Sequence, residues 1–487
     1  MKLLKKVCLI SSILVLLCNL SQVYAEPADV ESLKNNASYY QYSNGSSRLN
    51  YKISPSETTY YLYDSNGNTT KKISSKKPPM FTSSEYSGFE AYRLGDSSSS
   101  TFWSSNGHPV ETGQEWVATD LGENHIISGI SLTPRSTLGF PKDFKIQFSD
   151  NAVTWSDVPH QSYTNYVNNG SVQSFKFDSS VVARYVRVYA TKLGKDDMGN
   201  YYFQLSEFNA DLSNIAASSS LQGWSVNRLT DNNTSTLWST PAHGSESATE
   251  WIAFDLGNME TVGSISLTPR GTYSFPKDFK IQTSNDALTW SDVPNQSYTN
   301  YVNNGSVQTF TFESSVLAKY IRVHATKLSK DDMGSYYFQL AEFKANITNV
   351  AASSSLIDWP ASRLSDNNTA TSWSSVAHSN ESNTEWVILN LGSTKSLSGI
   401  TLSPRATLSF PKDFSIQASN NAIVWTDIPN QSYANYVNNG SAKNFNFTTP
   451  VSAKFIRIYA TKLNVDDRGS YYFQLNEIKA TLSSLKL

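Results

Sequence analysis

Short runs in which apolar and polar residues alternate recur along most of the chain. In the stretch DFKIQ, Phe144 and Ile146 are apolar while the neighbouring Lys145 and Gln147 are polar, which is typical of a half-buried β-strand. The strands predicted in this part of the chain are Trp116 to Leu121, Ile127 to Leu132, Phe144 to Phe148, Val172 to Phe177 and Tyr185 to Tyr189. The turn residues predicted to separate strands are Leu121-Gly122, Asp150-Asn151 and Asn168-Asn169-Gly170. No segment has sustained helical periodicity, so the pattern predicts an all-β fold of antiparallel sandwiches or jelly rolls.

This pattern occurs three times along the chain. The stretch SLTPRSTLGFPKDFKIQ at 131–147 returns as SLTPRGTYSFPKDFKIQ at 266–282 and as TLSPRATLSFPKDFSIQ at 401–417. Tryptophans, for which we expect core packing, keep the same interval: Trp103, Trp238 and Trp373; Trp116, Trp251 and Trp386; Trp155, Trp290 and Trp425. We therefore predict three tandem domains, here called repeats 1, 2 and 3, each long enough to enclose its own core. Their predicted boundaries are 78–212, 213–347 and 348–487.

The residues before the first repeat have a different character. A lysine-rich start, an apolar stretch and small residues up to Ala25 predict a cleavable signal peptide at residues 1–25. Residues 26–77 contain further alternating runs on either side of Asn66-Gly67, and they predict a small β-hairpin or meander. A polar linker that includes Lys71-Lys72 is predicted to follow.

Cysteine usage and charge restrict the class of protein. Both cysteines, Cys8 and Cys18, lie in the predicted signal peptide, so the mature chain would have no disulfide bonds. Export without disulfides favours a secreted bacterial protein, extracellular or periplasmic. The net charge of −2 provides no basic field for nucleic acid and disfavours contact with an anionic membrane. The oligomeric state does not follow from the sequence.

Each repeat has a loop that is dense in oxygen ligands. In repeat 2 this loop runs Asp231-Asn-Asn-Thr-Ser-Thr236, and Glu342 lies near the end of the same repeat. Carboxylate, amide and hydroxyl oxygens suit a hard cation such as calcium. The alternative is an Asx-turn that is held together by its own hydroxyl groups. The residue pattern leaves both interpretations open.

Each repeat also has a loop histidine and an arginine that follows a proline. These pairs are His108 with Arg135, His243 with Arg270 and His378 with Arg405. Imidazole and guanidinium donors together match the vicinal hydroxyl groups of a sugar. The alternative is that the histidine is only an exposed polar residue and that the arginine pairs with a nearby aspartate.

Recurrent aromatic residues could add a stacking surface. Tyr201-Tyr202-Phe203 returns as Tyr336-Tyr337-Phe338 and as Tyr471-Tyr472-Phe473. Because strand residues point alternately to opposite faces, we expect Phe203 in the core and one tyrosine of each pair facing out, where its ring can stack on a pyranose. An early loop places Phe89, Trp224 and Trp359 at equivalent positions.

Two further recurrent motifs have more than one explanation. The segment from Tyr163 to Gly170 could be a second contact surface or a hairpin braced by its own tyrosines. Asp196-Asp197 are adjacent carboxylates that cannot flank a scissile bond from two sides, so they indicate loop solvation or an acceptor for a ligand hydroxyl. The sequence has no Gly-x-Ser-x-Gly, His-Glu-x-x-His or phosphate-binding glycine loop, and we predict that the protein is not an enzyme.

The order of these motifs resembles a known family. Asp-x4-Thr-x-Trp, Trp-x3-Asp/Asn-Leu-Gly, Pro-Arg, Pro-x-x-Phe-x-Ile, Asn/Asp-x3-Trp and a terminal Glu follow one another in every repeat. This order resembles the discoidin, or coagulation factor V/VIII C-type, domain, and its bacterial branch is similar to family 32 carbohydrate-binding modules. The resemblance covers residues 78–482 and implies an eight-stranded jelly-roll sandwich in each repeat.

The resemblance also implies roles for residues. It implies one structural calcium per repeat, with the side-chain ligands Asp96, Thr101 and Glu207; Asp231, Thr236 and Glu342; Asp366, Thr371 and Glu477. It implies a sugar site at one end of the sandwich, formed by His108, Arg135 and Tyr202; His243, Arg270 and Tyr337; His378, Arg405 and Tyr472, with Phe89, Trp224 and Trp359 nearby. Galactose-binding relatives often use an acidic residue in the first loop, which only Glu85 of repeat 1 provides.

Our main hypothesis from the sequence is a secreted, non-catalytic, multivalent carbohydrate-binding protein of the lectin or adhesin kind. Its partners would be glycans or glycoconjugates, of the galactose type or of another type. The alternative is an adhesion protein that binds a protein or lipid surface, with Phe89, Trp224 and Trp359 as its contact residues. Binding to liposomes or competition by soluble sugars would separate the two hypotheses.

Overall fold

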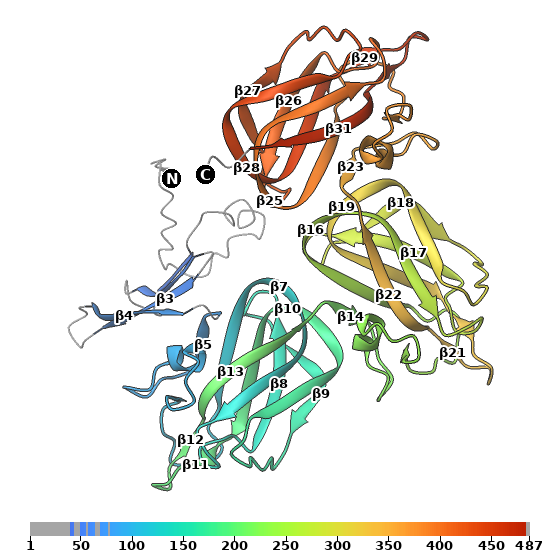
Figure 1. Cartoon of the computed structure of the whole chain (residues 1–487). Helices are drawn as coiled ribbons and strands as arrows, with labels where there is room; N and C mark the ends of the chain where they lie inside the picture. Colours follow the sequence, from blue (N-terminus) through green and yellow to red (C-terminus); the bar gives the residue numbers. More distant parts are fainter. Residues whose placement is uncertain (1–38, 43–48, 55–56, 64–68, 76–77, 484–487) are drawn as a thin grey trace, which may run out of the picture. The chain divides into compact units, whose positions relative to one another are not determined.

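The computed structural model describes residues 39–42, 49–54, 57–63, 69–75 and 78–483, so the predicted signal peptide lies outside the described residues. The chain divides into two compact units, Met1–Pro79 and Met80–Leu487 (Figure 1). In the first unit, an antiparallel sheet has the order β1-β2-β3-β4, with the strands β1 (Tyr39–Tyr42), β2 (Leu49–Ser54), β3 (Glu57–Tyr63) and β4 (Thr69–Ser75). Lys71 and Lys72 belong to β4, so the prediction that they are part of a linker is wrong.

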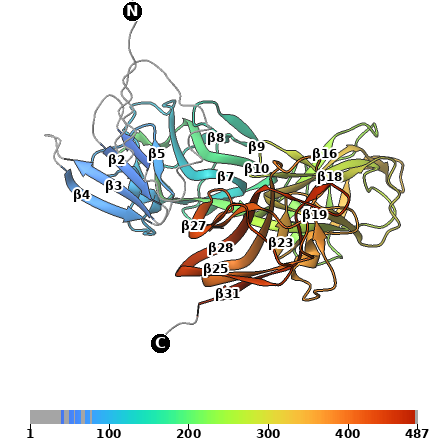
Figure 2. The same cartoon turned by 90° about the horizontal axis from the view of Figure 1, so that it is seen from above.

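The second unit contains three copies of one β-sandwich (Figures 1 and 2). Repeat 1 consists of β5 (Met80–Thr82), η3 (Ala91–Gly95), β6 (Trp103–Ser104), β7 (Glu115–Pro134), β8 (Asp143–Ser149), β9 (Ser156–Tyr163), β10 (Gln173–Lys192), β11 (Gly194–Lys195), β12 (Tyr201–Tyr202) and β13 (Gln204–Ser213). Repeat 2 consists of β14 (Ile215–Ala217), η4 (Val226–Thr230), β15 (Trp238–Ser239), β16 (Glu250–Pro269), β17 (Asp278–Ser284), β18 (Ser291–Tyr298), β19 (Gln308–Lys327), β20 (Ser329–Lys330), β21 (Tyr336–Tyr337) and β22 (Gln339–Ile347). Repeat 3 consists of β23 (Val350–Ala352), η5 (Ala361–Ser365), β24 (Trp373–Ser374), β25 (Glu385–Pro404), β26 (Asp413–Ser419), β27 (Thr426–Tyr433), β28 (Lys443–Lys462), β29 (Asn464–Val465), β30 (Tyr471–Tyr472) and β31 (Gln474–Leu482). The predicted all-β sandwich fold is confirmed.

Two long strands build both layers of each sandwich. In repeat 1, β7 and β10 are each 20 residues long and pair antiparallel along both of their halves. The first half of β7 and the second half of β10 form one layer with β5, β8 and β9. The other two halves form the second layer with β13 and β6.

The point at which β7 changes layer differs from the sequence prediction. Leu121-Gly122 was expected to separate two strands, but β7 continues through it as a bend. Gly122 has a φ of +84°, which suits glycine, and its N–H donates to Asp120 Oδ1 at 2.8 Å. An aspartate and a left-handed glycine, which often form a tight turn, therefore form a bend here, and the strand continues through it.

Each repeat has its own hydrophobic core, built from the inward positions of both layers. Phe144 and Ile146 are buried in the core of repeat 1, as their alternation predicts. Trp103, Trp238 and Trp373 are fully buried. Trp116, Trp155 and their counterparts are only partly buried, so core packing is wrong for the pairs of repeats 1 and 2. In repeat 3, Trp386 and Trp425 pack against a small buried cluster that includes Phe455. A guanidinium covers one of these rings in every repeat, because Arg187, Arg322 and Arg457 lie 4.1, 4.3 and 4.3 Å from the ring centres of Trp155, Trp290 and Trp425.

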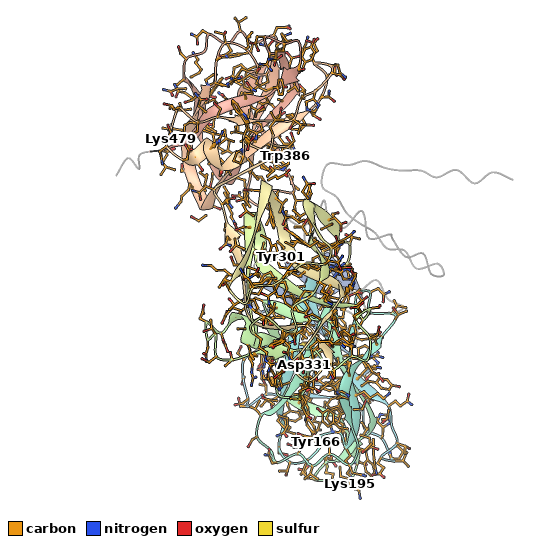
Figure 3. The ribbon with its side chains drawn as sticks, turned by 90° about the vertical axis from the view of Figure 1, so that its right-hand side faces the viewer. Tyr166, Lys195, Tyr301, Asp331, Trp386 and Lys479 are labelled. Carbon is orange, nitrogen blue, oxygen red and sulfur yellow. The ribbon has the colours of Figure 1, made fainter. Side chains whose placement is uncertain are left out.

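The strand order brings distant loops to one end of each sandwich. Because β7 bends in its middle, both of its ends lie opposite the bend, together with the start of β13 that pairs with Pro134. We call this the loop end; in repeat 1 it contains residues 83–90, 104–114, 135–142, 164–172 and 193–203. Figure 3 shows two of its residues, Tyr166 and Lys195, close to the same end of repeat 1.

Helices contribute little to the described part of the chain, where η3, η4 and η5 are five-residue 3-10 helices. Within that part, no helix is long and apolar enough to cross a membrane.

Candidate functional site

The predicted histidines lie at the loop end and are held by a buried carboxylate. In repeat 2, His243 pairs with Tyr336 through its backbone, and its Nε2 lies 2.7 Å from Glu250 Oε1. Glu250 is 3% exposed and also accepts hydrogen bonds from the hydroxyl groups of Ser218 and Ser219. The same arrangement joins His108 to Glu115 at 2.8 Å and His378 to Glu385 at 2.7 Å. A neutral ring that donates Nε2–H to the carboxylate leaves Nδ1 as an acceptor, so the imidazole would receive a hydrogen bond from a ligand rather than donate one.

The predicted arginines are held by a glutamine from β13 or its counterpart. Arg135 Nη1 donates to Gln204 Oε1 at 3.0 Å, and its guanidinium lies 4.6 Å from the ring centre of Phe102. Arg270 and Arg405 donate in the same way to Gln339 at 3.0 Å and to Gln474 at 2.9 Å. Since one guanidinium has five N–H donors, this bond leaves most of them available to a ligand.

Tyr202 lies beside the histidine loop. A Cβ added at Gly107, next to His108, would be 2.7 Å from Tyr202 Oη, so the phenol covers this backbone. The ring meets Tyr86 edge-on at 6.3 Å, and Tyr86 lies 6.1 Å from Phe89. Burial raises the pKa of Tyr202, and the nearby charge of Asp196 adds to this effect. The phenol is therefore neutral at physiological pH and can donate its O–H.

Ring contacts connect the other predicted aromatic residues of repeat 1 to the arginine. The rings of Phe89 and Phe102 are in tilted contact, with their centres 4.6 Å apart, and the guanidinium of Arg135 lies over the ring of Phe102. The structure thus brings together the loops of His108, Arg135, Tyr202 and Phe89. Glu85, the acidic residue of the first loop, accepts a hydrogen bond from Ala91 N at 3.2 Å and therefore also braces its own loop.

The adjacent aspartates have separate roles. Asp196 is buried and accepts hydrogen bonds from the backbone N–H groups of Met198 and Asn200 at 3.0 and 2.9 Å, so it shapes its loop. Asp197 is 60% exposed, with Oδ2 3.9 Å from Arg135 Nη2. Asp332 approaches Arg270 in the same way at 3.7 Å. In repeats 1 and 2 the loop arginine therefore lies beside an aspartate, as the alternative interpretation from the sequence expected.

The two tyrosines of the segment from Tyr163 to Gly170 pack inward, whereas Val167 is exposed. Tyr163 stacks on the buried Phe144 with ring centres 4.9 Å apart, and Tyr166 meets Phe144 edge-on at 5.4 Å. Its asparagine supports the arginine loop, because Asn168 Nδ2 donates to the carbonyl of Ser136 at 2.6 Å. These contacts favour the braced hairpin over a second contact surface.

The oxygen-rich loops have the same conformation in all three repeats. The residue after the first aspartate is left-handed in each copy, with φ of 64° at Ser97, 59° at Asn232 and 60° at Asn367. Thr236 Oγ1 donates to Asp231 Oδ2 at 2.7 Å, Thr371 to Asp366 at 2.7 Å and Thr101 to Asp96 at 2.6 Å. An internally bonded Asx-type loop is therefore present.

The carboxylates around this loop also fit a cation. In repeat 2, one buried carboxylate oxygen of Glu342 has no hydrogen-bond partner. Burial raises the pKa of Glu342, and the nearby negative charge of Asp231 contributes to the shift. Two carboxylates that approach each other in this way favour a bound cation or proton. Within the described ranges no cluster of three or more His, Cys, Asp or Glu side chains occurs, so hydroxyl and backbone oxygens would have to complete a calcium shell.

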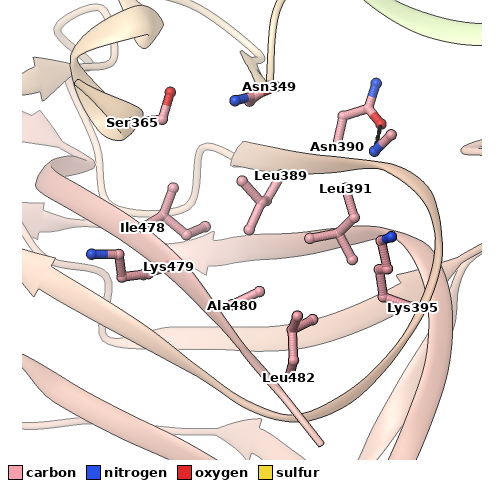
Figure 4. A pocket seen from close by; sticks show the side chains of 11 residues that line it. Asn349, Ser365, Leu389, Asn390, Leu391, Lys395, Ile478, Lys479, Ala480 and Leu482 are labelled. Carbon is pink, nitrogen blue, oxygen red and sulfur yellow. Dashed lines mark hydrogen bonds between the residues drawn. The ribbon is translucent and has the colours of Figure 1, made fainter. Parts of the chain in front are cut away.

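Repeat 3 has two hollows, and the second is lined in part by its counterpart of the segment from Tyr163 to Gly170. One, of about 390 Å³, lies at the bend of β25 and is lined by Leu389, Leu391 and Ile478 (Figure 4). Repeat 2 has Phe254 stacked on Phe343 at 5.5 Å in place of Leu389 and Ile478. The other, of about 380 Å³, lies at the loop end between Thr407 and Asn438.

Sequence reasoning missed the residues that hold the site together. These are the buried glutamates Glu115, Glu250 and Glu385, the glutamines Gln204, Gln339 and Gln474, and Phe102 under Arg135. The glutamates carried a usable signal, because each lies seven residues after its histidine and directly before a tryptophan. Nothing in the sequence marks the glutamines, because 69 residues separate each of them from the arginine that it holds.

The sequence model of the F5/8 type C domain family matches residues 50–208, 214–342 and 349–475. The chain belongs to this family. Its three F5/8 type C domains follow one another along most of the sequence, and the first match begins before the domain boundary predicted at residue 78. No curated protein matches the sequence.

Solved structures similar to these F5/8 type C domains include family 32 modules. The CBM32-1 and CBM32-2 domains of Clostridium perfringens ZmpB in complex with GalNAc are 14% identical, with a TM-score of 0.28, over 55% of this chain and 89% of that chain. The family 32 CBM of C. perfringens NanJ in complex with galactose is 25% identical, with a TM-score of 0.23, over 27% and 90%. Chitosan-binding module 2 of a chitosanase/glucanase from Paenibacillus sp. IK-5, in complex with chitotriose, is 25% identical, with a TM-score of 0.23, over 28% and 95%.

Proposed function

We propose that this protein is a secreted, non-catalytic, multivalent carbohydrate-binding protein that recognises glycans at the loop end of each repeat. The observation that carries the proposal is the convergence, three times along one chain, of a carboxylate-held histidine and a glutamine-held arginine in neighbouring loops. Membership of the F5/8 type C family is consistent with this role. Secretion rests on the signal peptide predicted at residues 1–25.

The site chemistry suits neutral sugars. The guanidinium supplies several donors, the imidazole Nδ1 an acceptor and the tyrosine a hydroxyl group that can do either, which together match adjacent sugar hydroxyls. Aromatic rings beside these groups offer an apolar face for the C–H side of a pyranose. The buried glutamate and the glutamine fix both polar side chains before a ligand arrives, which lowers the entropic cost of binding.

Removing the three arginines together should abolish multivalent binding. In the full chain, Arg135→Ala with Arg270→Ala and Arg405→Ala removes the main donors of every site. Because tandem display adds about 10²–10⁴ to the strength of surface binding, we expect apparent affinity for a responsive glycan surface to fall by at least about 10²-fold. A glycan array identifies the surface, and surface plasmon resonance on it measures the loss.

The matched control removes three positive charges elsewhere. Lys145→Ala, Lys280→Ala and Lys479→Ala change exposed strand positions and should leave glycan binding within about twofold. Equal binding by the arginine variant, or binding of the wild type only to liposomes and to no glycan, would contradict the proposal and favour the adhesion alternative.

We further propose that each repeat binds one structural calcium ion at its oxygen-rich loop. The ligand side chains would be Asp96, Thr101 and Glu207; Asp231, Thr236 and Glu342; Asp366, Thr371 and Glu477. The unpartnered buried oxygen of Glu342 supports this assignment in repeat 2. A bound cation would neutralise the two carboxylates and tie the loop to the end of the repeat.

Calcium should stabilise the protein, and acid should remove this effect. At about 100-fold excess over the dissociation constant a ligand adds about 3 kcal/mol, so EDTA should lower Tm by about 5–15 °C near pH 7. The pKa of Glu342 is raised in the calcium-free fold, so protons favour that fold and compete with calcium as pH falls. The calcium-dependent Tm shift should therefore shrink as the pH is lowered from 7, as measured by differential scanning calorimetry.

The isosteric variant Glu342→Gln provides the control for this prediction. It retains the volume of the side chain and removes one charge of repeat 2, so the calcium response of that repeat should be lost while the other repeats keep theirs. The same Tm in calcium and in EDTA for the wild type would refute the calcium assignment.

A further inference from the structure

The aromatic residue of the early loop has a different environment in each repeat. In repeat 3, Trp359 lies under two guanidinium groups, with Arg405 at 4.8 Å and Arg363 at 6.0 Å from its ring centre. The indole is thus part of a cation–π arrangement before any ligand binds.

Repeat 1 reaches a similar arrangement with phenylalanine rings. Arg93 lies 5.3 Å from the ring centre of Phe89, and Arg135 lies 4.6 Å from that of Phe102. Phe89 and Phe102 are themselves in contact at 4.6 Å, and Tyr86 adds a third ring at 6.1 Å from Phe89. The ring of Phe89 is therefore already in contact with an arginine and two other aromatic rings of the protein.

Repeat 2 lacks both arrangements. Leu237 replaces Phe102, so the ring that lies under the arginine of repeat 1 is missing. The counterpart of Arg93 and Arg363 is Arg228, which donates Nη1–H to the carbonyl of Leu237 at 3.1 Å, as Arg363 does to that of Ser372 at 3.4 Å, but of these two only Arg363 also lies over the ring of its repeat. In the part of the chain that the structure describes, no guanidinium and no second ring lies in contact range of the Trp224 indole.

One backbone hydrogen bond also differs between the repeats, although Phe89, Trp224 and Trp359 are all partly buried. In repeat 1, Ser104 N donates to the carbonyl of Phe89 at 3.1 Å, and in repeat 3, Ser374 N donates to that of Trp359 at 3.4 Å. The equivalent bond from Ser239 to Trp224 does not occur among the described residues of repeat 2. The turn itself is shared, because Trp224 N donates to the carbonyl of Leu221 at 2.8 Å as Phe89 N does to that of Tyr86 at 2.9 Å. The difference at Trp224 is therefore confined to this one bond.

We infer that the three sites are not equivalent and that Trp224 makes repeat 2 the principal stacking site of the protein. This inference rests on the proposed carbohydrate-binding function. The ligand class is a pyranose with an unsubstituted C–H face, which would stack on the indole while its hydroxyl groups bond to Arg270 and His243. Repeats 1 and 3 would bind mainly by hydrogen bonding, because their rings already contact arginines.

Full-length variants with two disabled sites test this inference. Arg135→Ala with Arg405→Ala leaves only repeat 2 active, and the other two pairwise combinations leave only repeat 1 or only repeat 3. Isothermal titration with a panel of soluble methyl pyranosides gives a Kd for each site. Because the chain has 11 tryptophans, the ligand-induced change in indole fluorescence that is lost on Trp224→Phe in this variant reports stacking on Trp224.

Substitution of the aromatic residue in each of these variants should reduce sugar affinity by different amounts in the three repeats. Trp224→Ala should weaken the repeat-2 site about tenfold, while Phe89→Ala and Trp359→Ala should change their own sites by less than about threefold. Trp224→Phe keeps a smaller ring and should give an intermediate loss, which separates lost stacking from misfolding. Leu237→Phe places a ring near Arg270, as in repeat 1, and should also weaken repeat 2.

The outcomes distinguish the inference from the function on which it rests. Equal losses in the three sites, or an unchanged Kd in the Trp224→Ala variant, would overturn the inference while leaving carbohydrate binding intact. A wild-type chain that binds no sugar of the panel and no glycan of the array would overturn the proposed function and the inference together.

Discussion

Replacing Trp238 with alanine should lower the free energy of unfolding of repeat 2 by about 3–5 kcal/mol. The indole is fully buried, meets Phe338 edge-on at 5.2 Å, and donates Nε1–H to the carbonyl of Ser219 at 3.2 Å. Removal of the ring leaves a cavity and an acceptor without its donor. Because each repeat has its own core, calorimetry should show the transition of repeat 2 moved to lower temperature by more than those of its neighbours, which it contacts through Met259 and Lys319.

An exposed aromatic residue of the same repeat serves as the control. Tyr273 is 52% exposed, and its replacement by alanine should change stability by no more than about 0.5 kcal/mol. A loss below about 1 kcal/mol in the Trp238→Ala variant, or an equal shift of all three transitions, would contradict the picture of three separate cores.

The fold was largely predictable from the sequence because its determinants are local. Alternation around Phe144 and Ile146 identifies a strand and its buried face without knowledge of its partners. The bend at Gly122 was missed because a left-handed glycine beside an aspartate looks the same in a tight turn and in a bent strand. Only the continued pairing of β10, on both sides of the bend, distinguishes the two.

The site was predictable in part. The loop residues His108 and Arg135 stand out because they recur at a fixed interval and have unusual chemistry for a strand protein. Their supports, Glu115 and Gln204, look like ordinary strand residues, and only the strand register of the folded sandwich places them against His108 and Arg135. The difference between Trp224 and Trp359 was beyond prediction, because both are tryptophans at equivalent positions and differ only in their neighbours.

Glu250→Ala should damage both the stability and the sugar affinity of repeat 2. The carboxylate is 3% exposed and accepts hydrogen bonds from His243 and Ser219, at 2.7 and 2.8 Å, and from Ser218. Each donor left without an acceptor costs about 1–3 kcal/mol, and the three are coupled, so we expect a loss of about 3 kcal/mol in unfolding free energy. Chemical denaturation measures this loss, and titration of the repeat-2 background variant measures sugar affinity.

The comparison with Glu246 separates a buried acceptor from an ordinary surface charge. Glu246 is 39% exposed and lies 3.6 Å from Lys277, so Glu246→Ala should cost less than about 1 kcal/mol. Glu250→Gln retains one acceptor oxygen and should fall between the two variants in stability. If Glu250→Ala lowers stability while the sugar affinity of the folded protein is unchanged, the glutamate supports only the fold. A parallel loss of affinity in Glu250→Ala and in His243→Ala would instead show that the carboxylate acts by orienting the imidazole towards the ligand.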